Sequence, residues 1–262
     1  MLADCHLHTE FSTDSETPMR AQAERALELG IPAICVTDHM DMDYPQGEFW
    51  LDTDRYMEAV RRLQEEYRGR LEIGFGVELG LMEHLRARQE EYLKKYPFDF
   101  VIGSVHLIHG EDPYNGELFR KYGDEEVFRE YFRLSHRLLA DAPSIQSWGH
   151  LDYVVRYGQN PEVYSYRKYA DEIDAVLKLL LEKGIALEVN TAGFRTLGRT
   201  NPEPDVLRRY RELGGELITV GSDGHQPEYL GYRFRETEEL LRSCGFSYYA
   251  VFRQRKPEFI KI

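Results

Sequence analysis

Cysteine is scarce in this chain of 262 residues, which has only three: Cys5, Cys35 and Cys244. Their odd number and their spacing fit neither a disulfide framework nor a zinc site built from cysteines. Cys5 and Cys35 lie in apolar, strand-like runs, so we expect reduced thiols inside a hydrophobic core.

Long apolar runs are also missing. No run approaches the roughly 20 residues that span a bilayer, and the first residues lack the basic and apolar regions of a secretory signal peptide. We therefore expect a cytoplasmic protein with no membrane partner.

Positive charge is outnumbered, with 33 lysines and arginines against 46 acidic residues and a formal net charge of −13. No nucleic-acid partner is expected, because a phosphate backbone prefers a basic surface. A small anionic substrate remains compatible with this charge, since two or three divalent cations in one pocket would reverse the local field.

The chain has no repeat, low-complexity tract or flexible linker, so we expect one domain over residues 1–262. Apolar runs of strand length alternate with helical patterns, which indicates an α/β fold with parallel strands and crossover helices. Seven such units suit a βα barrel. The expected strands cover 2–8, 33–39, 71–79, 99–106, 144–150, 185–191 and 217–223. The expected helices lie near 18–29, 53–69, 83–95, 125–140, 166–183, 203–213 and 235–243.

Three stretches, 40–52, 107–124 and 152–165, show no regular pattern. Loops of that length in a compact domain tend to be functional. Residues 246–262 are expected to form a strand and a tail.

Six of the seven expected strands end in residues that can bind a metal ion. The carboxyl ends of the strands of a βα barrel meet on one face, so these residues should become neighbours. They are His6, His8, Asp38, His39, Glu78, His106, His150 and Asp223, with His225 just beyond the last strand. The sixth strand ends in Asn190, preceded by Glu188.

His6 and His8 belong to an H-x-H pair. Side chains alternate along a strand, so both rings point to the same side, about 7 Å apart, and can tilt onto one cation. The pair alone is weak evidence for a metal site. Histidines at so many strand ends are stronger evidence, because core packing alone does not require them there. His84 and His136 lie in helical patterns and are expected outside the site, whereas His109 could reach it from a loop.

Imidazoles and carboxylates without thiolates favour zinc, manganese, iron or cobalt. The ligands are too many for one ion, and Glu78 could bridge two. Two cations about 4 Å apart lower the pKa of a shared water and support in-line displacement at phosphorus. Neither a G-x-S-x-G elbow nor a P-loop motif is present.

Six motifs in order, HLHT, TDH, GVE, GSVH, GHLD and GSDGH, resemble the PHP (polymerase and histidinol phosphatase) family. The longer strings YPFDFVIGSVH, GHLDYVVRYG, VNTAGFR and GSDGHQPEYLGY are similar to the stand-alone histidinol-phosphate phosphatases of that family. The resemblance covers nearly the whole chain. It implies a distorted (βα)7 TIM-like barrel with two or three divalent ions (zinc, manganese or iron) at the C-terminal ends of the strands.

The resemblance also implies three sets of metal ligands. They are His6, His8, Glu78 and Asp223 for one ion; Glu78, His106 and His150 for the second; and His39, His225 and Asp14 for the third. One common form of the family has histidine at position 14, and the carboxylate found here favours a harder ion. Glu78, Asp223 and His39 are the expected catalytic residues, and Asp38 is expected to orient a ligand.

Arg156 and Arg195 follow strand ends, and the resemblance implies that they bind the substrate phosphate. A guanidinium fork matches phosphate oxygens, although a solvated or salt-bridged arginine remains the alternative for each. Arg199 is a weaker candidate. The candidates for contacts with the cationic end of the substrate are Asp41, Asp43, Glu111, Asp112 and Asp152, with Trp50 or Tyr114 stacking on its ring; ordinary exposure is the simpler interpretation of each.

We expect a metal-dependent phosphomonoesterase that hydrolyses L-histidinol phosphate, in histidine biosynthesis, by attack of a metal-bound hydroxide on phosphorus. The alternative keeps this chemistry with another small phosphoester, a phosphotyrosine peptide or a nucleic-acid 3′ end. A non-catalytic metal-binding or regulatory domain is a third possibility, and it predicts the loss of some ligands.

Overall fold

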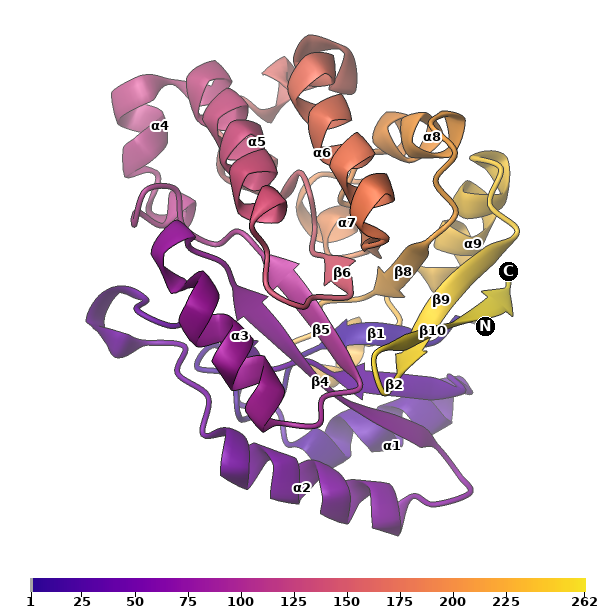
Figure 1. Ribbon diagram of the computed structural model, residues 1–262. Helices are drawn as coiled ribbons and strands as arrows, with labels where there is room; N and C mark the ends of the chain where they lie inside the picture. The colour runs from indigo at the N-terminus through magenta and orange to yellow at the C-terminus, as the bar shows by residue number, and fades with distance from the viewer. Residues whose placement is uncertain (1) are drawn as a thin grey trace.

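A parallel sheet that curls into a barrel forms the centre of the computed structural model, which describes residues 2–262 (Figure 1). Its strands follow the order β1-β2-β4-β5-β6-β7-β8, and the short β3 pairs with β4. The strands are β1 (Asp4–Leu7), β2 (Ala33–Val36), β3 (His39–Met40), β4 (Glu72–Gly80), β5 (Phe100–Ser104), β6 (Ser147–Trp148), β7 (Ala186–Asn190) and β8 (Ile218–Gly221).

The barrel closes between β1 and the end of β8. Leu7 forms a parallel bridge with Gly224, and the backbone N–H of His8 donates to the Gly224 carbonyl over 3.1 Å. The N–H of Asp223 donates to the His6 carbonyl over 2.7 Å. The expected α/β fold, a distorted TIM-like barrel of seven parallel strands, is therefore confirmed.

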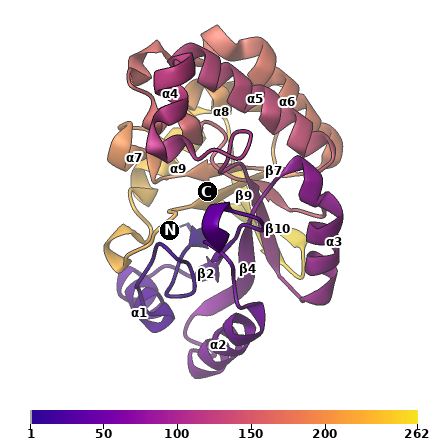
Figure 2. The same ribbon diagram turned by 90° about the vertical axis from the view of Figure 1, so that its left-hand side faces the viewer.

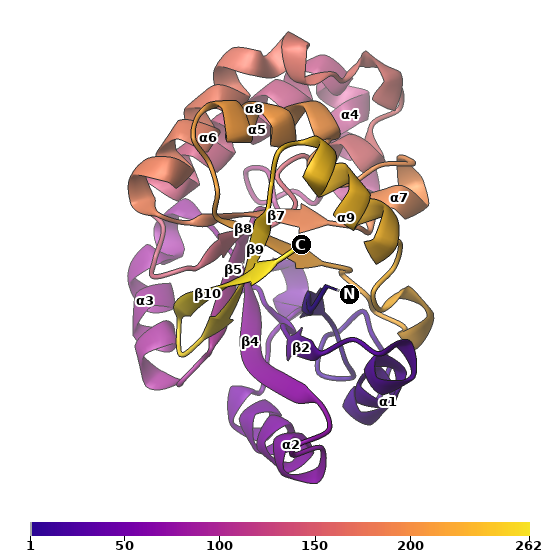
Figure 3. The same ribbon diagram turned by 90° about the vertical axis from the view of Figure 1, so that its right-hand side faces the viewer.

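Helices surround the barrel, as Figures 1 and 3 show. Their apolar stripes face the sheet, as the periodicity predicts; on α5, for example, Phe128, Tyr131 and Phe132 are fully buried. The helices are α1 (Met19–Leu29), α2 (Thr53–Glu66), α3 (Arg86–Lys95), α4 (Glu117–Tyr122), α5 (Asp124–Ala140), α6 (Ala170–Lys183), α7 (Gly193–Thr196), α8 (Pro204–Glu212) and α9 (Phe234–Ser243).

The structure differs from the sequence-based expectation in three places. The strand expected over 144–150 is reduced to the two residues of β6, although the N–H groups of Gln146 and Gly149 still donate to the carbonyls of Val101 and Gly103 on the neighbouring chain segment. The stretch 107–124 contains the short helix α4. The C-terminal segment is a hairpin of β9 (Tyr248–Arg253) and β10 (Lys256–Lys261) rather than a strand and a tail.

This hairpin covers the end of the barrel where β1 and β5 begin (Figure 3). The N–H of Ala3 donates to the Tyr249 hydroxyl over 2.9 Å, and the N–H of Gln254 donates to Asp99 over 3.0 Å. The opposite end, toward which Figure 2 looks, carries the long loops. The fold thus leaves the carboxyl ends of the strands as the place for a site.

The expected core cysteines are confirmed, because Cys5, Cys35 and Cys244 are all free and buried. Within residues 2–262 no helix combines the length and the apolar character needed to cross a membrane.

Candidate metal centre

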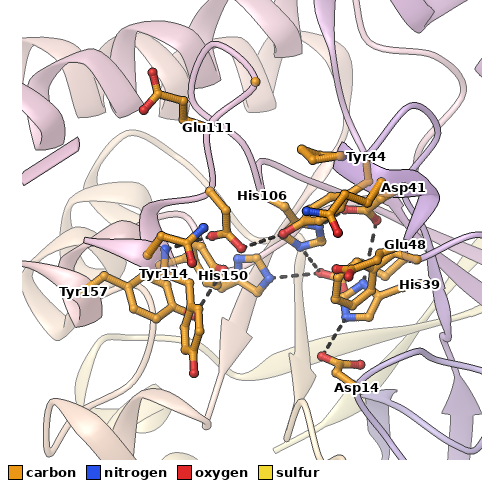
Figure 4. Close-up of a pocket in the computed structure, with 18 of the residues that line it drawn as sticks. Asp14, His39, Asp41, Tyr44, Glu48, His106, Glu111, Tyr114, His150 and Tyr157 are labelled. Atoms are coloured by element: carbon orange, nitrogen blue, oxygen red, sulfur yellow. Dashed lines mark hydrogen bonds and ion pairs between the residues drawn. The ribbon is translucent and has the colours of Figure 1, made fainter. Parts of the chain in front are cut away.

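One cavity of about 830 Å³ lies at the carboxyl ends of the barrel strands (Figure 4). Seven of the nine predicted metal ligands line it: Asp14, His39, Glu78, His106, His150, Asp223 and His225. The other two, His6 and His8, are fully buried and contact both Glu78 and Asp223. The structure therefore brings the predicted ligands together from across the chain.

The first predicted set lies at the end of β1. The Nε2 atoms of His6 and His8 face each other at 3.1 Å. The Glu78 Oε2 atom lies 3.2 Å from Nε2 of His6, and the Asp223 Oδ1 atom lies 3.3 Å from Nε2 of His8. His6, His8 and Asp223 offer donor atoms that all lie within 4.8 Å of one another, which is the spacing that one cation needs.

The second predicted set shares Glu78 with the first. The Glu78 Oε1 atom lies 3.0 Å from Nε2 of His150 and 3.2 Å from Nε2 of His106. Since the two oxygens of Glu78 face different groups of imidazoles, this carboxylate can bridge two cations.

The third predicted set lies nearer the cavity mouth. The Asp14 Oδ2 atom lies 3.0 Å from Nε2 of His225 and 3.8 Å from Nε2 of His39. The ring of His8 stacks between those of His39 and His225, with centroid distances of 4.3 and 4.1 Å. One common form of the family has a histidine at position 14. In this chain Asp14 places a carboxylate in reach of both imidazoles.

The protonation states of Glu78, Asp223 and His39 suit cation binding. Burial alone would raise the pKa of Glu78 and of Asp223, but the neighbouring imidazoles, chiefly that of His6, hold both values well below the ordinary range. Burial and the nearby His8 ring lower the pKa of His39 to about 4. At neutral pH the carboxylates are charged and His39 is neutral, with a lone pair free for a metal ion.

Unpartnered donor atoms support the same interpretation. Nδ1 of His39, Oε2 of Glu78 and Nδ1 of His150 are buried without a hydrogen-bond partner. Buried polar atoms are normally satisfied, and a cluster of imidazole and carboxylate lone pairs with no sulfur ligand is satisfied by zinc or a similar divalent ion. The residues present therefore fit a group of two or three such ions.

Two of the imidazoles are held from behind by side chains that orient their rings. Nδ1 of His8 contacts the Ser12 hydroxyl at 3.0 Å, and that hydroxyl donates to Asp38 over 2.7 Å, so Asp38 acts on the ligand through Ser12. Nδ1 of His106 lies 2.6 Å from Asp41. Sequence reasoning missed Ser12 and gave Asp41 only as a candidate for substrate contact or ordinary exposure. The structure buries Asp41 against His106, where its carboxylate can orient that ring.

The two predicted phosphate arginines lie in different positions. Arg156 lines the cavity; its guanidinium lies 4.1 Å from the Tyr153 ring centroid and 4.9 Å from that of Tyr157, and its Nε has no partner. Arg195 is not among the residues that line the cavity, and it donates to the Asp223 carbonyl over 3.3 Å. The phosphate-binding role of both arginines stays a prediction.

Arg199 forms an ion pair with the buried Asp152 over 2.9 Å, which matches the salt-bridged alternative for this arginine. Asp43 pairs with Arg88 on the surface, which matches ordinary exposure. Substrate contacts of these three residues stay predictions.

The remaining candidates for the cationic end of a substrate divide between the cavity and the surface. Glu111, Asp112 and Tyr114 line the cavity, whereas Trp50 is not among its lining residues and is 59% exposed. Asp112 accepts a hydrogen bond of 2.5 Å from the Tyr44 hydroxyl, which joins two long loops over the cavity.

The other three histidines lie outside this centre. His84 contacts Asp43, and His109 contacts Glu130 at 2.9 Å instead of reaching the cavity. His136 lies on α5. The distinction between histidines at strand ends and histidines in helices therefore matches the geometry.

Comparison with known proteins supports the same fold. The PHP domain family matches residues 4–192. The chain is 34% identical over 251 residues to a probable histidinol-phosphatase of Clostridium acetobutylicum, with 94% of each chain covered. It is 30% identical over 265 residues to a probable histidinol-phosphatase of Deinococcus radiodurans, with 98% of each covered.

A solved structure is similar over the whole chain. It is a histidinol phosphate phosphatase from Lactococcus lactis subsp. lactis in complex with zinc, L-histidinol and phosphate. The TM-score is 0.91 at 31% identity, and 98% of each chain is covered.

Proposed function

This chain belongs to the PHP domain family, and we propose that it is a histidinol-phosphatase, a phosphoric monoester hydrolase that releases phosphate from L-histidinol phosphate. A place in histidine biosynthesis follows from that activity. The observation that carries the proposal is the convergence of nine imidazoles and carboxylates on one site. The chain around this site matches, over 98% of its length, a phosphatase that holds zinc, L-histidinol and phosphate.

The proposed cofactor is a group of two or three divalent ions. Zinc is favoured because the similar Lactococcus lactis structure contains it, and manganese or iron are the alternatives. The proposed ligands are His6, His8, Asp14, His39, Glu78, His106, His150, Asp223 and His225. When bound, such ions supply the positive charge and Lewis acidity that attack of water at phosphorus requires.

The protein's own groups would hold the substrate in place. The Arg156 guanidinium lies over two tyrosine rings with a free Nε, and it would bind phosphate oxygens from one side of the cavity. Arg195 donates to the Asp223 carbonyl and would bind phosphate oxygens next to that residue. Glu78, Asp223 and His39 are the proposed catalytic residues, because they lie where the ligand sets meet.

The outer cavity favours a substrate that carries a cation. Beyond the ligands, its wall contains Glu48, Glu111, Asp112 and Glu117, with Arg156 as a cation deeper in. Such a wall suits the ammonium and imidazole of L-histidinol phosphate and repels polyanions. It therefore favours this substrate over a phosphotyrosine peptide or a nucleic-acid 3′ end.

The other expectations from the sequence stay proposals. We infer one domain over residues 1–262, and a cytoplasmic location on the ground that all three cysteines are free and buried.

The proposal is tested by assaying phosphate release from L-histidinol phosphate with added zinc, manganese or iron, together with elemental analysis of the purified protein. We expect turnover of L-histidinol phosphate and at least two bound ions per chain. Negligible turnover with every metal, together with rapid hydrolysis of another phosphoester, would contradict the proposed substrate.

A Glu78→Ala protein separates catalysis from mere metal binding. Glu78 contacts five imidazoles through its two oxygens, so its removal should abolish nearly all phosphate release. Full turnover by this variant would favour a non-catalytic role for the metal centre.

A further inference from the structure

Glu188 lies inside the barrel on β7 and contacts the metal centre from behind. Its side chain is 1% exposed. The Oε1 atom lies 2.5 Å from Nδ1 of His6, and the Oε2 atom accepts the backbone N–H of His150 over 2.7 Å. One carboxylate therefore contacts a ligand of the first set and the backbone of a ligand of the second.

Glu188 is not itself placed as a ligand. It contacts Nδ1 of His6, whereas Nε2 on the other side of that ring faces His8 and Glu78. No group of donor atoms close enough to share a cation, within residues 2–262, includes Glu188. Its position is thus behind the ligands.

The contact between Glu188 and His6 is possible because β8, which lies between β7 and β1, has a glycine, Gly221, next to both side chains. A Cβ on Gly221 would lie 2.2 Å from Cβ of His6 and 3.1 Å from Oε1 of Glu188. Without a side chain at this position, the carboxylate reaches across an intervening strand to an imidazole 182 residues away in the sequence. Gly221 therefore keeps the path between Glu188 and His6 open.

We propose that Glu188 is a positioning residue that holds His6 and His150 in register with each other, and so couples the first and second ligand sets. By accepting the Nδ1 proton of His6, the carboxylate leaves the Nε2 lone pair of that ring directed at the cation. By accepting the N–H of His150, it fixes the turn after β6 from which that ligand projects. The inference rests on the proposed metal centre but not on the identity of the substrate.

Glutamine at position 188 provides a sharp test. Both oxygens of Glu188 accept hydrogen bonds: Oε1 from His6, and Oε2 from the His150 N–H and from the Asn190 side-chain amide at 3.2 Å. Glutamine has one acceptor oxygen and an amide that would face a donor on the other side. Glu188→Gln therefore keeps the size of the side chain and breaks the contact with either His6 or His150. We expect its zinc affinity, measured by competition with a chromogenic chelator, to fall about 10- to 100-fold.

Thr219 offers a matched control. It pairs with Glu188 in the register of β7 and β8, is equally buried, and contacts only the Ser147 hydroxyl, at 2.8 Å, with no contact to a ligand. Thr219→Val should keep the zinc affinity of the wild type. The visible spectrum of the cobalt-loaded protein should change in Glu188→Gln and not in Thr219→Val, because only the first substitution alters the environment of a ligand.

The possible outcomes are distinct. Wild-type zinc affinity and an unchanged cobalt spectrum in Glu188→Gln would overturn the inference, as would an equal loss of affinity in Thr219→Val. If the wild type bound no zinc, the proposed metal centre would fail and this inference with it. If Glu188→Gln does not fold, Glu188→Asp, which keeps the charge but shortens the reach, is expected to lose zinc affinity in the same way.

Discussion

Arg156 is the cavity arginine that we propose to bind the substrate phosphate. Its guanidinium lies over the rings of Tyr153 and Tyr157 at the cavity wall, and its Nε has no partner. Loss of its hydrogen bonds to a charged group should cost about 2–3 kcal/mol of transition-state binding, so Arg156→Ala should lower kcat/KM roughly 30- to 150-fold. Steady-state kinetics with L-histidinol phosphate measure this change.

The exposed Arg167 serves as the control for this substitution. Arg167→Ala should leave kcat/KM unchanged. An Arg156→Ala enzyme with wild-type kcat/KM would show that Arg156 has only a structural role. Arg156→Lys should recover only part of the activity, because an ammonium cannot form the two parallel hydrogen bonds of a guanidinium.

Glu203, which lies outside the predicted metal ligands, should make the stability of the protein depend on pH. Burial, together with the nearby Asp152 and against the pull of Arg199, raises the pKa of Glu203 from 4.5 to about 7. The folded state therefore binds a proton more tightly than the unfolded state, so this group's contribution to stability is present below pH 4.5 and is lost as the pH rises to 7. Glu203→Gln should abolish this decrease in the free energy of unfolding between pH 4.5 and pH 7.

The measurement is urea unfolding of the metal-free proteins at pH 5 and pH 8. The free energy of unfolding of Glu203→Gln, relative to the wild type, should be higher at pH 8 than at pH 5 by up to about 3 kcal/mol. The same substitution at the exposed Glu162 should give no such difference. A pH-independent effect of Glu203→Gln would refute the prediction.

At the level of secondary-structure elements and loops, one hydrogen bond joins two loops for which the sequence shows no regular pattern. The Tyr44 hydroxyl donates to Asp112 over 2.5 Å, between the stretches 40–52 and 107–124. Tyr44→Phe removes a hydrogen bond to a charged group, and the freed loops should hold the substrate less well. KM should rise roughly five-fold, with kcat nearly unchanged.

Hydrogen exchange of residues 40–52 provides a second measurement, and these amides should exchange faster in Tyr44→Phe. Tyr122→Phe, on the exposed face of α4, is the control. Unchanged KM and unchanged exchange in Tyr44→Phe would show that the hydrogen bond does not restrain the loops.

The alternation of apolar runs and helical patterns predicted the elements well, because burial against one barrel imposes that alternation. It failed where pairing partners, not local hydrophobicity, decide the length of a strand. β6 has only two residues because only Ser147 and Trp148 pair in register with both β5 and β7. The hairpin of β9 and β10 was missed because its outer strand is exposed and lacks a regular apolar face.

Stability of the whole molecule should depend on the metal ions. The centre concentrates buried carboxylates and imidazoles, several of them with no hydrogen-bond partner. Ions bound only by the folded state contribute about 2.7 kcal/mol at a free concentration of 100 times Kd. Removal of the ions with a chelator should therefore lower Tm by about 5–10 °C, and added zinc should restore it.

Differential scanning calorimetry with and without chelator tests this dependence, and added magnesium serves as the control, because it binds imidazole poorly. Equal Tm values for the metal-free and zinc-loaded proteins would show that the centre does not bind zinc tightly.

The sequence by itself determined which side chains meet. Strand periodicity and the common direction of the strands place His6, Glu78, His150 and Asp223 on one face of a barrel, and both are local properties of the chain. The family motifs added the expected division into ligand sets.

Only the tertiary structure decided which partner each of these groups has. Asp152 pairs with Arg199, Asp41 holds His106, and Glu188 reaches His6 across Gly221. Such contacts join residues that are far apart in the sequence. They depend on how the barrel closes and on where a side chain is absent, and no local pattern encodes either.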